Sequence, residues 1–521
     1  MKKYIIIISM ALNCSLLFAQ TEFDAIKLEL PDLYGSARYM GMAGAFGALG
    51  GDASSIKDNP AGLGIYRTSE LSTTLNFLNQ TTTSNWPYYN SGLNDSFSKE
   101  KSMNLGINNL AYIIANSTNR SRSGNEGLLN SNWSFTFDKI KSFDRSATIE
   151  SGYSPSSITQ YMAYFSNGIK STDMNNSSNP FDNTELPWIS IMGYQGYLIN
   201  ETINPTSGKS EYNSLLNTNE KVQPLYSITE AGSINEYSIG WSGNFSNKLY
   251  LGVTFNFQSV DYSMLSTLTE NFADGGNMKL TNILNTSGAG VNLNLGTIYR
   301  PSDILRLGFS VHTPMVYGLT DVNSAIMNYN LSSTNYGNFQ SPEYSTSYFL
   351  ATPWKIDVSG ALLFGKKGLI SAEYVNSFNT ESYFYDSNGS QSFKDENAGM
   401  ISVLKDVQTI KFGGEYKLNS NFSLRAGYAY ITSGSHEDAD KLMRYNTTRT
   451  DTEYFQHFQT NFYSLGFGYR ESNWFMDCAF MSKLTDEIFY PYNSNLLANK
   501  ANSALVQTLN NNFVLTLGLK F

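Results

Sequence analysis

The sequence predicts an all-β protein, a 14-stranded antiparallel transmembrane β-barrel preceded by a compact N-terminal segment. Three observations predict this fold. Of the 521 residues, 14% are aromatic and only 15% are charged, whereas about 25% are charged in typical globular domains. Most of the chain after Leu71 alternates apolar and polar residues with period two, which indicates strands with one apolar face. The connections between these strands alternate between short and long, as they do in outer-membrane barrels.

The first 19 residues have the pattern of a signal peptide. Two lysines precede an apolar stretch from Tyr4 to Phe18, and the small residue Ala19 follows it. An acylated Cys14 is the less favoured alternative, because Asn13 stands where lipoproteins have a small residue. Removal of this peptide leaves Cys478 as the only thiol, so we expect an exported chain without an intramolecular disulfide.

Charge and hydropathy exclude two classes of protein. The formal net charge is −9, and the sequence pI is about 5.1, so the chain lacks the basic footprint of a nucleic-acid-binding protein. Outside the N-terminus, no apolar run approaches the roughly 20 residues that a membrane-spanning helix needs. Any membrane span is therefore expected to consist of strands.

Residues 20–70 form the compact segment. They do not alternate, and small residues dominate between Gly41 and Leu63. Glycines allow close backbone approach and positive φ angles, so this segment suits packing within a confined space. A phosphate-binding loop is the weaker interpretation, since no strand-then-helix context surrounds the glycines.

Residues 71–521 form the predicted barrel. In one strand Tyr237, Ile239 and Trp241 share one face, and serines and asparagines occupy the other. The last strand alternates from Phe513 to Phe521, and an aromatic residue that ends an amphipathic strand resembles the sorting signal of outer-membrane barrels. An array of soluble β-sandwiches is the competing architecture, but no Pro/Gly-rich linkers or internal repeats support it.

The lengths of the connections give the strand count. Fifteen stretches resemble strands, and the weakest, at 321–330, is assigned to an extracellular loop so that short and long connections alternate and both termini lie on the periplasmic side. Fourteen strands remain, an even number as expected for a bacterial barrel. The expected short turns lie near 246–248, 301–303, 365–367, 418–420 and 471–473, and the expected long loops span 80–102, 144–233, 261–287, 318–346, 378–404, 433–457 and 486–510.

The largest expected loop, 144–233, contains two stretches with helical periodicity. Ile158, Met162 and Phe165 recur with helical spacing, and Trp188 and Met192 belong to a similar stripe after a proline. Such stripes either pack against each other as a small cap or line a groove for a hydrophobic ligand. Methionine and aromatic side chains suit variable lipophilic ligands.

Charged residues are also expected on the luminal face of the barrel, where they need partners. Lys411 and Arg425 are the candidates for holding a ligand carboxylate. The three histidines lie far apart in the sequence, so no metal site, catalytic site or cofactor is expected. His312 is the residue that a haem-binding alternative would use. The expected luminal charges are Lys355, Asp357, Lys411, Glu415, Arg425 and Arg470.

A short motif in the compact segment resembles a known family. Asp52-Ala53-Ser54-Ser55-Ile56 is followed by Asn59-Pro60-Ala61-Gly62-Leu63, and this combination is similar to the N-terminal hatch signature of the FadL/TodX family of outer-membrane transporters for hydrophobic compounds. Lys57-Asp58 replaces the aromatic pair that usually precedes the asparagine. The resemblance is sharp in the hatch and covers the barrel only by pattern.

The resemblance implies that residues 20–70 are a hatch inside the barrel lumen. Its site residues would be Phe46, Asp52, Asn59, Pro60 and Ala61. Proline fixes φ and pushes the preceding residue to an extended conformation, so the first role expected of Asn59-Pro60 is structural, and a role beside the ligand path is the second.

The resemblance also implies a function. The chain would be a passive transporter of long-chain fatty acids or aromatic hydrocarbons, a monomer and not an enzyme. Its other expected partners are outer-membrane lipid, lipopolysaccharide and the barrel-assembly machinery. The alternatives are a general porin and a haem-binding or adhesive surface barrel.

Overall fold

The computed structural model describes residues 20–87, 96–118, 126–175, 179–216, 220–386, 389 and 393–521. The expected signal peptide, residues 1–19, lies outside the described residues. Within the described ranges, no helix is long and apolar enough to cross a membrane.

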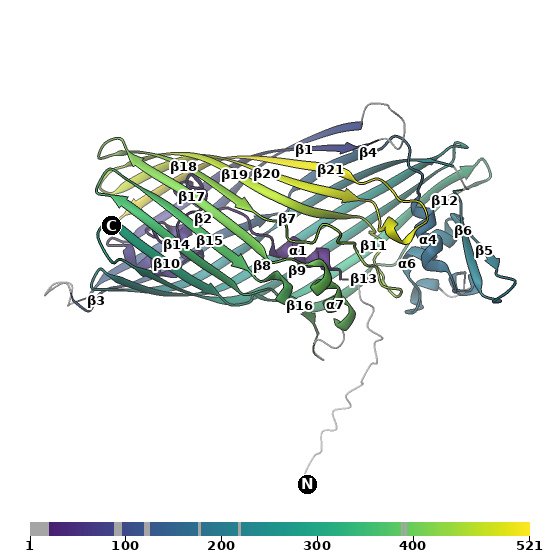
Figure 1. Cartoon of the computed structure of the whole chain (residues 1–521), viewed down its shortest axis with the longest axis horizontal. Helices are drawn as coiled ribbons and strands as arrows, with labels where there is room; N and C mark the ends of the chain where they lie inside the picture. The colour runs from purple at the N-terminus through teal and green to yellow at the C-terminus, as the bar shows by residue number, and fades with distance from the viewer. Residues whose placement is uncertain are drawn as a thin grey trace, which may run out of the picture.

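A single closed antiparallel sheet forms the wall of the molecule (Figure 1). Most strands pair with the strand that follows them along the chain, and β1 pairs with β21 over nearly their whole lengths, which closes the barrel. The strands of this sheet are β1 (Glu70–Trp86), β2 (Ser96–Ser117), β3 (Leu128–Ser142), β4 (Arg145–Glu150), β7 (Val222–Phe245), β8 (Leu249–Phe272), β9 (Asn277–Tyr299), β10 (Leu305–His312), β11 (Val316–Ser332), β12 (Asn335–Gln340), β13 (Tyr344–Ala351), β14 (Lys355–Phe364), β15 (Gly368–Ser377), β16 (Tyr383–Tyr385), β17 (Val407–Lys417), β18 (Phe422–Ile431), β19 (Tyr454–Arg470), β20 (Trp474–Tyr490) and β21 (Ala504–Lys520).

Three wall strands are interrupted. β3 and β4 both pair with β7, β10 and β11 both pair with β9, and β13 and β14 pair with β11 and β10. β3 with β4, β10 with β11, and β13 with β14 are therefore the two pieces of one wall strand each. With β12 and β16 as short additions above the wall, the described residues form 14 wall strands, which confirms the predicted count.

The strands extend further than the sequence suggested. The expected loop at 261–287 consists mostly of β8 and β9, which a turn at residues 273–276 connects, and 318–346 is mostly β11, β12 and β13. The weak stretch at 321–330 belongs to β11, which continues β10 beyond the break. These predictions were wrong because polar residues that alternate above the membrane were interpreted as loops.

At the end of the barrel opposite the C-terminus, α4, α6, β5 and β6 form a cap (Figure 1). The β5–β6 hairpin is a separate two-stranded sheet. The elements outside the wall and outside the N-terminal segment are α4 (Ile158–Ser166), α5 (Ser171–Met174), η3 (Pro180–Asp182), α6 (Trp188–Gln195), β5 (Ile199–Ile203), β6 (Ser210–Ser214), η4 (Asn379–Glu381), α7 (Lys394–Val403) and η6 (Ser494–Leu496).

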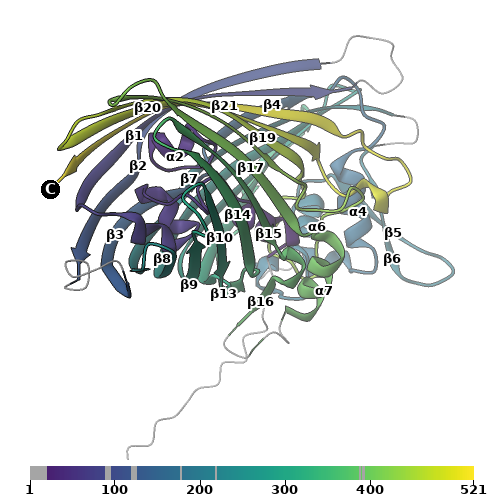
Figure 2. The ribbon, with the colours of Figure 1, turned by 60° about the vertical axis from the view of Figure 1, so that its left-hand side comes forward.

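Residues 20–69, which we call the luminal segment, lie inside the barrel (Figure 2). Ser36, Asp52 and Asn59 each begin a short helix by accepting a hydrogen bond from a backbone N–H of its first turn. The helices of the segment are α1 (Glu22–Glu29), α2 (Ala37–Met40), η1 (Ala53–Lys57) and η2 (Pro60–Ile65).

Glycines of the wall receive the luminal segment. A Cβ atom on Gly296 would lie 2.0 Å from Oδ1 of Asn59, and one on Gly252 would lie 2.3 Å from the carbonyl carbon of Pro60. A Cβ atom on Gly427 would likewise lie 2.3 Å from the carbonyl carbon of Met42. The segment therefore approaches the wall so closely that only glycine fits at these positions.

Candidate functional site

Two cavities lie in the lumen, on either side of the C-terminal end of α1. Leu30, Pro31 and Lys141 line both of them. The cavity nearer the short turns, which we call the inner cavity, measures about 170 Å³. The outer cavity measures about 180 Å³. Each is comparable to an engineered cavity of about 150 Å³ that binds benzene.

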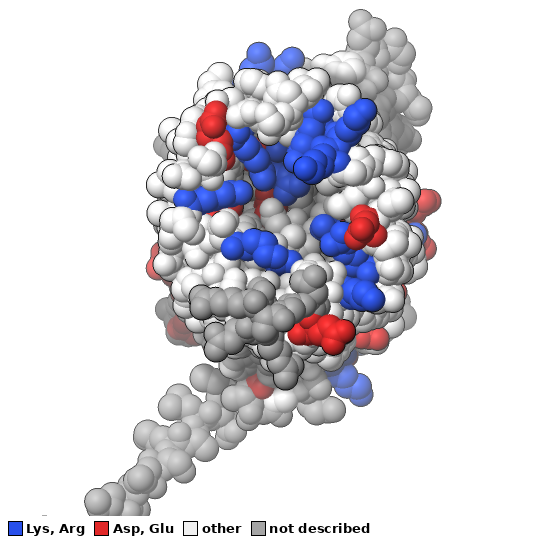
Figure 3. Space-filling model, turned by 90° about the vertical axis from the view of Figure 1, so that its left-hand side faces the viewer, with Lys and Arg blue, Asp and Glu red and all other residues white. Residues whose placement is uncertain are grey.

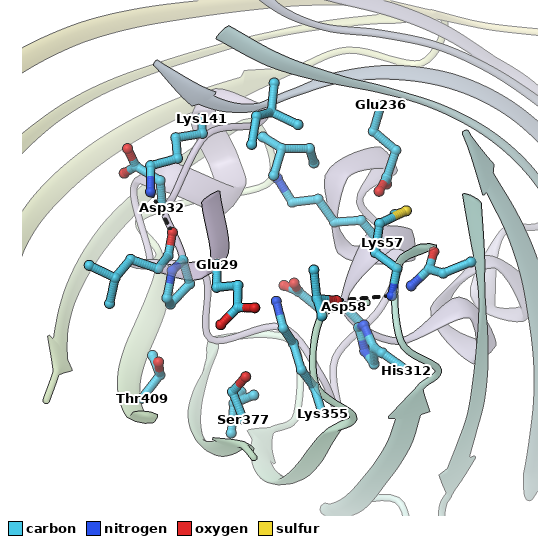
Figure 4. Close-up of a pocket in the computed structure, with 18 of the residues that line it drawn as sticks. Glu29, Asp32, Lys57, Asp58, Lys141, Glu236, His312, Lys355, Ser377 and Thr409 are labelled. Carbon is cyan, nitrogen blue, oxygen red and sulfur yellow. Dashed lines mark hydrogen bonds between the residues drawn. The ribbon is translucent and has the colours of Figure 1, made fainter. Parts of the chain in front are cut away.

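The inner cavity has a mixed lining (Figure 4). Apolar side chains come from the luminal segment and from several wall strands, including Leu33, Ile140 and Val407. Acidic and basic side chains line the same space. They are Glu29, Asp32, Lys57, Asp58, Lys141, Glu236, His312, Lys355, Asp357 and Lys411.

Lys355, at the start of β14, differs from the neighbouring lysines of this cavity in its contacts. The other wall lysine beside it, Lys411, has carboxylate partners, and Lys141 donates to the backbone carbonyls of Lys27 and Leu30. For Lys355 the described residues provide neither an ion pair nor a hydrogen bond. Its ammonium group is therefore available to an anionic group in the cavity.

Helix α1 separates the two cavities and carries buried carboxylates. Burial raises the pKa of Glu29 to about 8, although Asn379 donates a hydrogen bond of 2.9 Å to it. Burial likewise raises the pKa of Glu22 to about 7. Near neutral pH, Glu29 is therefore mostly protonated and Glu22 is partly protonated.

Ion pairs hold α1 in the lumen. Lys27 lies 2.7 Å from Glu230 of β7, which also pairs with Arg145 of β4 at 2.6 Å. On the other side, Arg449 lies 3.3 Å from Asp24. Arg449 belongs to the connection between β18 and β19, so a segment far along the chain fixes this helix.

The predicted ligand-binding cations Lys411 and Arg425 face the lumen, but both are paired with wall carboxylates. Arg425 contacts Glu415 at 2.7 Å and Asp477 at 2.6 Å, and Glu415 also receives Arg38 of the luminal segment at 2.9 Å. The carboxylate of Glu415 therefore links the segment to the wall.

Lys411 takes part in a second link of the same kind. It lies 2.6 Å from Oε1 of Glu373, whose Oε2 accepts a hydrogen bond of 2.7 Å from the backbone N–H of Gly47. Lys411 also lies 3.7 Å from Asp58. Both cations thus hold the luminal segment in place, and a role in ligand binding stays a prediction.

The five predicted hatch residues lie close to the wall or in the centre of the segment. The side-chain amide of Asn59 donates to the carbonyls of Gly47 and Thr297 at 2.7 and 3.1 Å, and Oδ1 accepts from the N–H of Ala61 at 3.1 Å. Pro60 begins η2 and faces a wall glycine. These contacts are what the structural role of Asn59-Pro60 requires.

Phe46 and Asp52 pack inside the segment. Phe46 is fully buried, and the guanidinium carbon of Arg38 lies 5.1 Å from its ring centroid. Asp52 accepts hydrogen bonds of 2.8 Å from the hydroxyl of Ser36, and burial raises its pKa. Neither residue lines the inner or the outer cavity.

His312 points toward the luminal segment. Its Nε2 lies 2.8 Å from the backbone carbonyl oxygen of Asp58, a distance at which the ring N–H donates a hydrogen bond. Among the described residues, no group of three or more His, Cys, Asp and Glu side chains is arranged to hold a metal ion.

The predicted loop-groove residues meet in the cap. Ile158, Met162 and Phe165 of α4 are buried, as are Trp188 and Met192 of α6. A Cβ atom on Gly193 of α6 would lie 3.0 Å from the Cβ atom of Met162, so the two helices are in close contact. The two stripes therefore pack against each other as a cap, and ligand capture between them stays a prediction.

A break in the wall lies beside both cavities. Within the described range of β2, residues 96–107 pair with β1 alone, because the β2–β3 pairing begins only at Asn109. Beyond the break, β4 pairs with β7, and side chains bridge it to β2. Nδ2 of Asn104 donates to Asp144 at 2.5 Å, and the hydroxyl of Thr148 donates to Glu100 at 3.0 Å. Ile140 and Lys141 of β3 line the inner cavity, and residues 141–145 line the outer one.

Three features of the site were missed in the sequence. Lys355 was expected to be paired, because sequence alone does not show which carboxylates reach a luminal lysine. The break between β3 and β4 is only two residues long, Phe143 and Asp144, and these residues have no pattern that predicts a break. The wall glycines at 252, 296 and 427 lie on strands, where an isolated glycine does indicate a close backbone approach.

A barrel with its N-terminal segment packed inside, two luminal cavities and a broken wall strand defines a class of plugged outer-membrane channels. The family model described as "Outer membrane protein transport protein (OMPP1/FadL/TodX)" matches residues 234–513, more than half of the chain. The chain belongs to this family. The predicted resemblance is therefore confirmed.

One solved structure shares the fold, and others are similar to the chain. A crystal structure of a Pseudomonas aeruginosa FadL homologue aligns with a TM-score of 0.52 at 12% identity and covers 95% of this chain and 100% of that chain. The Pseudomonas putida toluene transporter TodX gives a TM-score of 0.49 at 13% identity, over 94% of this chain and 99% of that one. The Ralstonia pickettii toluene transporter TbuX gives 0.46 at 12% identity, with the same two coverages. No curated protein matches the chain in sequence.

Proposed function

We propose that this protein takes up small hydrophobic molecules passively across the outer membrane, without converting them chemically. The observation that supports this most directly is the pair of cavities enclosed by one barrel and separated by α1. Membership of the OMPP1/FadL/TodX family supports the same function. A general porin would need an open lumen, and the luminal segment occupies it.

The cargo that fits the inner cavity best is an amphiphile with one carboxylate. Its apolar part would contact side chains such as Leu33 and Val407, and its carboxylate would lie beside Lys355. A fully apolar cavity would favour neutral aromatic hydrocarbons, but ten acidic or basic side chains line this one. We therefore favour the long-chain fatty acid class over the aromatic hydrocarbon class.

Lys355→Met tests this choice. We expect a fatty acid to bind the purified barrel about tenfold more weakly, because an ionic hydrogen bond contributes about 1.5–3 kcal/mol, and toluene binding to stay unchanged. Lys279→Met, at an exposed position on β9, is the matched control. Equal loss for both ligands would contradict the carboxylate assignment, and recovery of the protein with no bound lipophile and no uptake of either class would contradict the transport function itself.

We further propose that the cargo leaves sideways through the break between β2 and β3–β4. The luminal segment is fixed to the wall by ion pairs and close glycine contacts, whereas side chains bridge the break. Opening the break therefore costs less hydrogen bonding than removing the segment. Capture at the cap would come first, and displacement of α1 would connect the two cavities.

A cross-link across the break tests this route. In a Cys478→Ser background, Asn104→Cys with Asp144→Cys should lower uptake to background when the two thiols are joined, and reduction should restore it. Asn79→Cys with Asn511→Cys joins two regularly paired residues of β1 and β21 and should leave uptake unchanged. Full uptake through the cross-linked break would exclude the lateral route.

The proposal also covers how the protein reaches the outer membrane and contacts it. A signal peptide over residues 1–19 would direct export, the barrel-assembly machinery would insert the chain, and the protein would work as a monomer among outer-membrane lipids and lipopolysaccharide. The outer face of the barrel, with residues such as Leu105, Phe255 and Leu465 exposed, suits contact with hydrocarbon.

A further inference from the structure

The end of the barrel that carries the short turns and the C-terminus has a charge opposite to that of the whole chain. Figure 3 shows Lys and Arg side chains gathered around the centre of this face. By contrast, the stretch of sequence from 150 to 221, which belongs to the other end, includes seven acidic and three basic residues. We call the nine cations at the short-turn end the basic ring: Arg67, Lys248, Arg300, Arg306, Lys366, Lys367, Lys417, Arg470 and Lys520.

The ring borders the mouth of the barrel at the start of β1 and from the β7–β8 turn to the end of β21. Its members come from the end of the luminal segment, from five successive short connections or the strand ends beside them, and from the end of β21. The described acidic residues at this end are fewer, namely Glu70, Glu126, Asp303, Glu415, Glu471 and Asp477, and Asp477 lies 3.9 Å from Arg470.

Strand alternation places three members of the ring on the luminal side of the wall. Arg306, Arg470 and Lys520 each lie next to a residue on the outward face, and the neighbours Leu307 and Leu519 are exposed to lipid. Nη1 of Arg306 donates to the backbone carbonyl of Leu49 in the luminal segment at 2.7 Å. Successive residues point to opposite faces of a strand, so these cations border the mouth and do not face the surrounding membrane.

Four lysines of the ring are free to engage a partner. Lys248, Lys366, Lys367 and Lys417 are exposed, and none of them forms an ion pair with a described residue. The acids nearby are already engaged. Asp303 pairs with Arg300 at 2.6 Å, and Glu471 accepts hydrogen bonds from Tyr469 and Asn421.

We propose that the basic ring is a docking surface for an acidic soluble protein on the periplasmic side of the membrane. The turns at 246–248, 365–367 and 471–473 are short, and a cluster of cations around a mouth attracts and orients a partner of the opposite charge. Lipid headgroups fit less well, because the outward-facing residues at the same level include Tyr299, Phe364 and Phe521, which are not cations. This docking goes beyond the proposed uptake and does not depend on the identity of the cargo.

Binding of poly-L-glutamate to the barrel in nanodiscs tests the charge recognition. In phosphatidylcholine discs, the fourfold Lys→Glu variant at positions 248, 366, 367 and 417 should bind at least about tenfold more weakly than wild type, since it loses and reverses several modest charge pairs. The fourfold Lys→Arg variant should bind like wild type, as should Lys→Glu at the extracellular positions 170, 209, 221 and 405. Raising the salt concentration should weaken binding to wild type.

The same variants distinguish a protein from a lipid. A photo-crosslinking residue in place of Lys417 should give a protein adduct in cells, and the adduct should disappear when positions 248, 366 and 367 carry Glu but persist when they carry Arg. Adducts with lipid alone, or loss of poly-L-glutamate binding in discs that contain phosphatidylglycerol, would show that headgroups occupy the ring and overturn the proposal. Equal binding by all variants would overturn it as well.

Discussion

Single glycines decide how closely the luminal segment approaches the wall. At Gly296 the missing Cβ atom leaves room for the side chain of Asn59, which satisfies two carbonyl groups and one N–H group in a buried setting. Buried polar groups of this kind are costly to leave without partners. The tolerance of the wall for substitution should therefore vary sharply between neighbouring glycines.

Gly296→Ala should loosen the segment without unfolding the barrel. A Cβ atom would displace Oδ1 of Asn59, and overpacking of this kind costs about 1–3 kcal/mol. We expect a corresponding loss of hydrogen-exchange protection in residues 59–65. Gly360→Ala is the matched control, because a Cβ atom added there would have no neighbouring atom within 4 Å, and similar losses in both variants would contradict the prediction.

At the scale of elements, we expect the docking of α1 between the two cavities to depend on pH. Burial raises the pKa of Glu29 to about 8 and that of Glu22 to about 7, from ordinary values near 4.5. Between about pH 4.5 and pH 8, the docked helix therefore binds more protons than the undocked helix. This contribution to docking is fully present below pH 4.5 and is lost as the pH rises through 7 and 8.

Hydrogen exchange measures this dependence directly. Protection factors of the α1 amides, corrected for intrinsic exchange, should fall between pH 6 and pH 9 in the wild type. Glu22→Gln with Glu29→Gln should make them nearly independent of pH, and Glu211→Gln, an exposed control on β6, should behave like wild type. A flat profile in the wild type would show that the two carboxyl groups do not control docking.

Elements differ in how well the sequence predicts them. The alternation in residues 236–258 gave β7 and β8 correctly, because one face meets lipid and the other does not. The same alternation near Asp261 and Thr281 lies in the parts of β8 and β9 that the sequence assigned to a loop, since the residues there are more polar. Helix α1 carries no comparable signal, and its place in the lumen depends on partners such as Arg449 that are distant in the chain.

The candidate site was predictable in its residues more than in its contacts. The motif around Asn59 located the centre of the luminal segment, and the alternation placed Lys411 and Arg425 on the luminal face. Which of the luminal cations is free depends on strand register. Register joins Lys411 to Glu373 and leaves Lys355 opposite Ser377, and sequence alone does not determine it.

At the scale of the whole molecule, the luminal segment fills the barrel, which would be an open pore without it. Deleting residues 20–66 should leave a closed sheet, since β1 pairs with β21 independently of the segment, and should produce discrete ion-conductance steps in planar bilayers. The intact protein should show none. Deletion of residues 204–209, at the exposed tip of the β5–β6 hairpin, is the control and should leave conductance at the noise level.

The ion pairs of the luminal segment also constrain the order of assembly. Arg38 precedes the first strand, yet its partner Glu415 lies 377 positions later in the chain. Long-range contacts of this kind form late, because a long loop must close before they contribute. During insertion, Arg38 therefore has no partner in β17 until most of the wall has formed. The segment must already lie inside the barrel when β21 pairs with β1. Closure of the barrel and locking of the segment are thus coupled, so that a chain truncated before β17 would lose both.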